Sequence, residues 1–206
     1  MSQGSWILNK LKSSIFLFVI IACSSPRQPL PIYGEKQINS EGKEVDYTVS
    51  KFNFLNQNNQ IVTQEKYQNK VYVTDFFFTT CQTICPKMTN ELVRVQKKLK
   101  DKDFYILSHT VNPEFDTTDI LLDYALKMDA ELSNWDFVTG DAQEIYKQAA
   151  SYQLTAIKDT TQPIPFVHSE YLVLIDKKNR IRGFYDGTDT LEVNKLIEDL
   201  QWLIQR

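Results

Sequence analysis

The segment from Val71 to Pro86 constrains the fold of this 206-residue chain more than any other. Residues 71–78 are a largely apolar run of the kind that a sheet buries on both faces. Cys81 and Cys85 follow directly, and Pro86 suits the first turn of a helix. The pattern predicts a strand that delivers two thiols to the start of a helix. At a spacing of i, i+4 in a helical turn both sulfur atoms would lie on one face, where helix amides stabilise thiolate over thiol.

Residues 1–22 have the features of a processing signal. Lys10 and Lys12 precede an apolar stretch, residues 15–22, that is shorter than the ~20 residues needed to span a bilayer. The stretch runs into Cys23 through Ile20-Ile21-Ala22, which resembles the lipobox of bacterial lipoproteins except at Ile21, where a small residue is usual. We therefore expect a signal peptide over residues 1–22 and an extracytoplasmic lipoprotein, anchored to the membrane through an acylated Cys23. A plain secretory signal is the alternative.

The rest of the chain divides into a tether and one domain. Residues 24–43 hold prolines, glycine and charges without an apolar period, so we expect a flexible, lipid-anchored tether over residues 23–45 and a folded domain over residues 46–206. Without Lys10 and Lys12, 21 of the 23 basic side chains remain against 26 acidic ones, a net charge of −5. This balance argues against nucleic acid as a partner.

Hydrophobic periodicity predicts an α/β order of elements in the domain. Strands are expected at residues 71–78, 104–108, 135–138, 171–175 and 181–185. Helices are expected at residues 86–99, 142–152 and 191–204, and a further helix is expected to begin at residue 117 or 118. A small N-terminal hairpin is expected at residues 52–55 and 60–62. This order predicts a central mixed sheet flanked by helices, with the hairpin as an extension. A dithiol at the junction of the first core strand and its helix is the arrangement of a thioredoxin-like fold.

The two thiols have three interpretations. A stapling disulfide would enclose only three residues and restrain little of the unfolded chain, so a redox-active dithiol or a metal site explains them better. In an oxidising compartment, with Cys23 acylated, they are the one remaining thiol pair. His168 precedes the strand expected at 171–175, which in a thioredoxin-like sheet lies close to the dithiol turn. Two thiolates and an imidazole form a soft site that suits Cu(I) and still holds Cu(II). A histidine with an ordinary hydrogen bond is the alternative for His168.

Four stretches of the chain resemble the Sco/SenC family. Residues 76–86 match the family's strand followed by the CxxxCP pattern, and Asn112–Thr117 is close to the family's D-P-x-x-D-T block. Residues 135–140 resemble a third family segment. In residues 168–176 a histidine opens a strand that ends in Ile-Asp, as in the family. The resemblance covers about residues 46–206. It implies a membrane-tethered, thioredoxin-like protein that binds copper and supports maturation of the Cu(A) centre of cytochrome c oxidase. Residue by residue, it implies Cys81, Cys85 and His168 as copper ligands. Asn112 replaces the family's usual aspartate and removes a charge from that loop.

Several other polar residues have roles that the sequence leaves open. Asp75 lies six residues before Cys81, the offset at which thioredoxin has a buried acid that assists proton transfer. It is either a group near the thiols that raises their reactivity without binding the metal itself, or an ordinary hydrogen-bonded aspartate. His109 is expected in a loop after the second strand, and Asp186 and Asp189 in an ordinary turn.

Two functions remain open from the sequence. The first is a copper metallochaperone that delivers the metal to the Cu(A)-bearing subunit of cytochrome c oxidase or another copper client. The second is an enzyme, a thiol–disulfide oxidoreductase that reduces cysteines of such a client before metal arrives. Both use Cys81 and Cys85, but only the first needs His168, since disulfide exchange runs between sulfur atoms. A thiol peroxidase is less favoured, because nothing beyond the thiols marks a peroxide-activating site.

Overall fold

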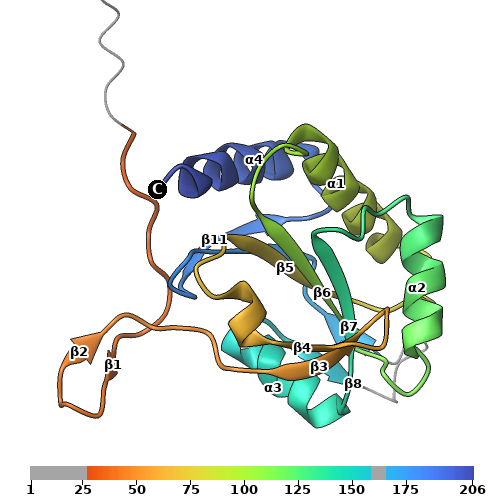
Figure 1. The fold of residues 1–206 in the computed structure, drawn as a ribbon, viewed down its shortest axis with the longest axis horizontal. Coiled ribbons are helices and arrows are strands. Elements are labelled where there is room, and N and C mark those ends of the chain that lie inside the picture. Colours follow the sequence, from red (N-terminus) through yellow and green to blue (C-terminus); the bar gives the residue numbers. More distant parts are fainter. Residues whose placement is uncertain (1–26, 159–165) are drawn as a thin grey trace, which may run out of the picture.

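The structure is a computed structural model that describes residues 27–158 and 166–206, without the side chains of Val167 and His168. Its centre is a seven-stranded sheet with the strand order β11-β10-β5-β6-β7-β3-β4 (Figure 1). The three strands β5 (Tyr72–Phe77), β6 (Tyr105–Thr110) and β7 (Trp135–Thr139) are parallel, and every other neighbouring pair is antiparallel. The sheet is therefore mixed, as the sequence predicts.

The remaining elements lie close to their expected positions. The outer strands of the sheet are β10 (Tyr171–Ile175), β11 (Ile181–Asp186), β3 (Asn53–Asn56) and β4 (Ile61–Thr63). The helices are α1 (Ile84–Lys98), α2 (Thr118–Lys127), α3 (Ala142–Ser151), α4 (Thr190–Ile204) and the short 3₁₀ helix η1 (Gln64–Tyr67). The predicted N-terminal hairpin is β3 with β4, which extends the sheet beyond β7. Two short strand pairs lie outside the sheet and were not predicted: β1 (Gln37–Ile38) with β2 (Glu44–Val45), and β8 (Ala156–Lys158) with β9 (Phe166–His168).

The strand β5 is buried along its whole length because it is paired on both sides and covered on both faces. On one face Phe77 contacts the ring of Tyr124 from α2, with the ring centroids 5.2 Å apart. On the other face Phe76 stacks on His109 at 4.6 Å. Alternate side chains of one strand thus fill both layers of the core, which explains its continuous apolar sequence.

The helices form two layers around the sheet. Right-handed crossovers place α1 and α2 on the same face, where the hydroxyls of Thr89 and Tyr124 lie 2.8 Å apart. The helix α4 lies beside α1 (Figure 1) and α3 covers the opposite face. Thr117, Asp141 and Asp189 cap α2, α3 and α4 by accepting hydrogen bonds from amides of the first turns.

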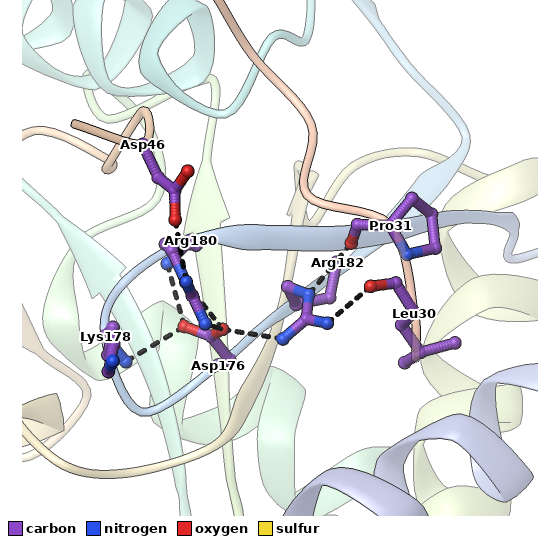
Figure 2. Close-up of polar contacts among 7 residues, drawn as sticks. All are labelled: Leu30, Pro31, Asp46, Asp176, Lys178, Arg180 and Arg182. Carbon is purple, nitrogen blue, oxygen red and sulfur yellow. Dashed lines mark hydrogen bonds and ion pairs between the residues drawn. The ribbon is translucent and has the colours of Figure 1, made fainter. Parts of the chain in front are cut away.

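Residues Arg27–Gly34, which we call the N-terminal strap, are bound to the domain. The amide of Tyr33 donates to the carbonyl of Ile181 at 3.0 Å, as an isolated bridge to the edge strand β11. The buried guanidinium of Arg182 donates to the carbonyl oxygens of Leu30 and Pro31 (Figure 2). These contacts tie the strap to the outer edge of the sheet.

The same guanidinium completes an ion-pair network. Arg182 and Arg180 both bind the carboxylate of Asp176 at 2.8 Å, and Arg180 also reaches Asp46 at 2.8 Å (Figure 2). The carboxylate of Asp176 is largely buried, and these arginines, together with backbone amides, outweigh its burial, so its pKa lies below its ordinary value. The network joins the strap, the β10–β11 turn and the segment before β3.

The sequence predicts a flexible tether over residues 23–45, and the structure shows that Arg27–Gly34 within this range contact the domain. Most of these contacts are made by backbone groups, which leave no trace in hydropathy. The apolar residues of the core lie between Val49 and Leu203. Within the described residues, no helix has both the length and the apolar character needed to cross a membrane.

Replacing Arg182 by alanine should lower the free energy of unfolding by about 3 kcal/mol, because it leaves the Asp176 carboxylate short of a buried partner and frees the strap. Urea unfolding measures the change. The matched Lys178→Ala variant removes an exposed cation of the same turn and should change stability by about 0.5 kcal/mol or less. Equal effects of the two substitutions would contradict the role of Arg182.

Candidate dithiol and metal site

The two thiols lie where β5 passes into α1. The helix begins at Ile84, so Cys85 is in its first turn and Cys81 precedes it. The amide of Cys81 donates to the carbonyl of Phe78 at 3.2 Å, which makes a turn between strand and helix. The expectation that both cysteines share one helical turn is therefore wrong. The two side chains still lie close enough for each thiol to shift the pKa of the other.

The thiols differ in exposure and acidity. Cys81 is partly exposed and Cys85 is fully buried. Burial raises the pKa of Cys81, but hydrogen bonds from the Cys85 side chain and from the backbone of Cys85 and Thr83 outweigh it, so the pKa lies below its ordinary value. Burial raises the pKa of Cys85 far above its ordinary value, and the hydrogen bond to Cys81 adds to this rise. The site thus pairs an accessible, acidic thiol with a buried, weakly acidic one.

Asp75 lies buried on the strand that leads to the dithiol. Its carboxylate accepts a hydrogen bond from the hydroxyl of Ser108 at 2.5 Å, and that hydroxyl accepts from Trp135 Nε1 at 2.9 Å. Burial raises the pKa of Asp75 to about 7, against the lowering effect of Ser108. The charge of Asp75 also contributes to the raised pKa of Cys85. Asp75 is therefore able to exchange a proton near neutral pH within electrostatic range of the dithiol.

Asp116 holds the loop in front of Cys81. Its fully buried carboxylate accepts from the amide of Thr79 at 3.1 Å and from the hydroxyls of Thr79 and Thr110. The turn that carries Asp116 closes through its own amide, which donates to the carbonyl of Asn112 at 2.9 Å. Because Asn112 acts here through its backbone, the departure from the family's aspartate leaves these contacts intact. In the sequence Asp116 stands out only as part of the family pattern Asn112–Thr117, and no local signal indicates its contact with the dithiol loop.

The backbone of His168 approaches the same end of β5. His168 ends β9, opposite Ala156, and β10 begins at Tyr171. Since β10 runs antiparallel to β5, its first residues lie beside the end of β5 that leads to Cys81. The ring of Phe166 contacts that of Phe78, with centroids 5.3 Å apart. The His168 side chain lies outside the described part of the structure, so its role as a ligand stays a prediction.

Among the described side chains, no group of three histidines, cysteines or acids is arranged to hold a metal ion. The sequence predicts the imidazole of His168 as the third donor, and this side chain lies outside the described residues. The two described members, Cys81 and Cys85, are adjacent thiols, the donor type that soft metal ions prefer. The described residues therefore supply two of the three predicted donors at one point.

His109 is not a loop residue, contrary to expectation. It lies in β6, is fully buried, and is surrounded by the rings of Phe52, Phe54, Phe76 and Tyr152. Burial lowers its pKa to about 3, so it is neutral at physiological pH. Asp186 and Asp189 belong to the turn before α4, as predicted, where Asp189 is also the helix cap.

These features define a thioredoxin-like domain with a dithiol at the first strand–helix junction. The family model SCO1/SenC matches residues 40–205, and the chain belongs to this family. Residues of this chain are 32% identical over 160 positions to the SCO1 protein homolog of Bacillus subtilis (strain 168), covering 76% of this chain and 83% of that protein.

Solved structures agree with this assignment. A SCO1/SenC family lipoprotein from Bacillus anthracis str. Ames has a TM-score of 0.71 and 28% identity, covering 76% of this chain and 95% of that one. BsSco, a member of the Sco family of cytochrome c oxidase assembly proteins in which a disulfide switch was identified, has a TM-score of 0.69 and 31% identity, covering 77% and 94%. The copper-bound ScoI of Bradyrhizobium japonicum shares the fold with a TM-score of 0.62 at 24% identity, covering 76% and 99%.

Alkylation should distinguish the two thiols. Iodoacetamide should modify Cys81 about tenfold faster than Cys85 or more, because Cys81 is accessible and one pKa unit alone changes the thiolate fraction tenfold. The alkylation rate of Cys81 should rise with pH and then level off when the thiol is fully ionised. Since its pKa is lowered, this plateau should begin at a lower pH than for a cysteine in a short peptide. Mass spectrometry of the Cys85→Ser and Cys81→Ser variants assigns each rate. Equal rates in the reduced protein would contradict the asymmetry.

Replacing Asp116 by asparagine should loosen the dithiol loop. The amide group of asparagine would face three donors with one acceptor oxygen, so we expect a loss of about 1–3 kcal/mol in unfolding free energy. Urea unfolding measures this loss, and the alkylation rate of Cys81 should change with it. Glu114→Gln, on the same loop but exposed and paired only with Lys158 among the described residues, is the control and should leave both unchanged.

Proposed function

We propose that this protein binds copper through Cys81, Cys85 and His168 and delivers it to the Cu(A)-bearing subunit of cytochrome c oxidase or another copper client outside the cytoplasm. The observation that carries the proposal is the turn at the end of β5 that places Cys81 just before α1 and Cys85 in its first turn, at the end of the strand that the backbone of His168 approaches. Two sulfur donors and an imidazole suit Cu(I) and can also hold Cu(II). Membership of the SCO1/SenC family supports the proposal, as do the copper-bound ScoI and BsSco.

Each residue has a part in the transfer of copper as cargo. The partly exposed Cys81 receives copper or hands it to the client first, because its sulfur is accessible and more easily deprotonated. Cys85 releases its proton when the metal binds, since metals bind thiolates. Asp75, with its pKa near neutrality, is placed to take up a proton from the buried side of the site. Asp116 keeps the loop in the geometry that both sulfur atoms need.

Oxidation of the dithiol would switch copper binding off. A Cys81–Cys85 disulfide forms when both thiols lose a proton and the pair loses two electrons to an oxidised partner disulfide, which becomes a dithiol. The disulfide leaves no thiolate for the metal. The proximity of the two thiols, each of which shifts the pKa of the other, supports this reaction, and BsSco offers a precedent for a disulfide switch.

The asymmetry of the thiols favours a second candidate function, a thiol–disulfide oxidoreductase. The Cys81 thiolate would attack a client disulfide and release one client thiolate, forming a mixed disulfide. Cys85, after losing its proton, would then attack the sulfur of Cys81, release the second client thiolate and leave a Cys81–Cys85 disulfide. An accessible attacking thiol backed by a buried resolving thiol suits these steps.

The location that we propose is the outer side of a membrane, with the mature chain anchored through an acylated Cys23. The signal-like residues 1–22 and the lipobox-like sequence before Cys23 support this location. The family relative from Bacillus anthracis str. Ames that is described as a lipoprotein also supports it.

Copper titration of reduced chain 24–206 tests the copper function. We expect His168→Ala to weaken Cu(II) binding by more than about 100-fold, because losing a residue that only hydrogen-bonds to a metal ligand already costs about 10–100-fold. The variant should also lose the thiolate-to-Cu(II) charge-transfer band. Cu(I) should stay bound to the two sulfur atoms. The oxidised wild type should bind neither ion at this site. Ser169→Ala, one residue away, is the matched control and should titrate like the wild type.

Thiol exchange and oxidase assembly separate the two functions. A copper donor requires His168, so His168→Ala should fail to support oxidase assembly while it reduces a model disulfide at the wild-type rate. If this variant supports assembly as well as the wild type does, the reductase function replaces copper delivery. If oxidised and reduced protein load equal amounts of copper, the dithiol is not the metal site.

A further inference from the structure

The two ends of the central sheet carry different charge. The dithiol loop lies at the carboxyl end of β5. The described loops at that end, residues 78–83, 111–117, 140–141, 169–170 and 187–189, contain no lysine or arginine. Their acidic residues are Glu114, Asp116, Asp141, Glu170 and Asp189. Two cations outside these loops partly offset the acids, since Lys158 on β8 pairs with Glu114 and Lys87 in the first turn of α1 acts on Asp186. The loops around the dithiol still carry more acidic than basic side chains.

The opposite end is basic. The described loops and chain end there are residues 68–71, 99–104, 128–134, 176–180 and 205–206. They hold seven basic residues, Lys70, Lys100, Lys102, Lys177, Lys178, Arg180 and Arg206, against five acidic ones, Asp101, Asp103, Asp129, Glu131 and Asp176. The domain is thus polarised along its strands although its overall charge is negative.

A pocket of about 180 Å³ lies at this basic end, between the β10–β11 turn and the end of α4. Five of its lining residues are cationic, Lys177, Lys178, Arg180, Arg182 and Arg206, and Asp176 is the acidic one. Asp176 and Asp46 neutralise the two inner arginines (Figure 2). No ion pair joins Lys177, Lys178 or Arg206 to a described acidic side chain. The ammonium of Lys177 makes one long hydrogen bond, 3.4 Å to the carbonyl of Ile204, so these three charges have no anionic partner among the described residues.

A hydrogen-bond donor in the same pocket also lacks a partner. The indole Nε1–H of Trp202 is buried and has no acceptor among the described residues. The guanidinium of Arg206 lies over its ring, 4.1 Å from the centroid. A phosphate oxygen is an acceptor of the kind that this donor and the neighbouring cations would bind.

The N-terminal strap starts at this same end. Arg27 pairs with the carboxylate of Asp199 on α4 and donates to the carbonyl of Glu198 at 3.2 Å. Figure 1 shows the strap beginning beside the C-terminal end of α4. Only four chain steps separate Arg27 from Cys23, a reach of at most about 14 Å. An acyl chain on Cys23 would therefore keep the basic end, rather than the dithiol end, close to the bilayer.

We infer that the basic end formed by Lys177, Lys178, Arg206 and their pocket is a docking surface for the headgroups of anionic phospholipids, which holds the domain upright with the dithiol directed away from the membrane. This inference rests on the anchoring at Cys23 that is part of the proposed function. The six residues of β5 separate the two ends by about 20 Å, twice the distance over which salt screens charge. The bilayer would therefore attract the basic end and scarcely affect the acidic one.

Vesicle binding by chain 24–206 tests the docking surface. This chain contains the whole core and carries no lipid, so its binding reports the protein surface alone. It should sediment with vesicles of phosphatidylcholine and phosphatidylglycerol but not with phosphatidylcholine alone. Lys177→Gln with Lys178→Gln should weaken binding about 30-fold, since one lysine near an anionic surface contributes roughly fivefold, or ~1 kcal/mol. A single phosphate ion contacts the pocket without the rest of the anionic surface, so inorganic phosphate should compete no better than chloride at equal ionic strength. Stronger competition by phosphate would identify the pocket as a site for free phosphate and overturn the lipid assignment.

The control removes equal charge elsewhere. Lys147→Gln with Lys195→Gln changes two exposed lysines on α3 and α4 outside the pocket and should leave vesicle binding within about twofold of wild type. Equal losses in both double variants, no preference for phosphatidylglycerol, or wild-type binding by the Lys177/Lys178 variant would overturn the inference. Copper titration of the same samples keeps the two proposals separate, because the docking variant should load copper like the wild type.

Discussion

The position of β5 between β6 and β10 brings the parts of the candidate site together. Its parallel pairing with β6 brings the loop of Asp116 beside the dithiol loop, because both loops leave the carboxyl ends of neighbouring strands. Its antiparallel pairing with β10 brings the residues before Tyr171, including the backbone of His168, to the same edge. One buried strand thus gathers three distant parts of the chain at one point, which is the general logic of sites at strand ends in α/β sheets.

Local environment, rather than residue type, gives the two cysteines different properties. Cys81 lies in a turn where amides and a neighbouring thiol stabilise its anion, whereas Cys85 enters the helix with its sulfur in the core. A metal donor and a disulfide reductase can both use such a pair, so the thiols alone do not distinguish the two functions. The distinction rests on His168, which only metal binding requires.

The strap gives the fold a second organising contact at the opposite end from the dithiol. Arg182 is a buried cation whose donors are divided between Asp176 and two backbone carbonyls of the strap. An arginine fork can satisfy these acceptors at once, which a lysine could not. The path of the chain is therefore held by specific contacts back to Arg27, which lies against the C-terminal half of α4.

The α/β order, the mixed sheet, the dithiol junction and the family could be predicted from the sequence, because long apolar runs, helix periodicity and the CxxxCP pattern are local signals. Four features could not: Cys81 lies before the helix, His109 is buried among aromatic rings, Asp116 holds the dithiol loop, and the strap contacts the domain from Arg27 onward. These features depend on hydrogen bonds and burial between segments distant in the chain. Hydropathy and spacing describe a residue's own neighbourhood, and they contain no information on which distant carbonyl or carboxylate will lie against it.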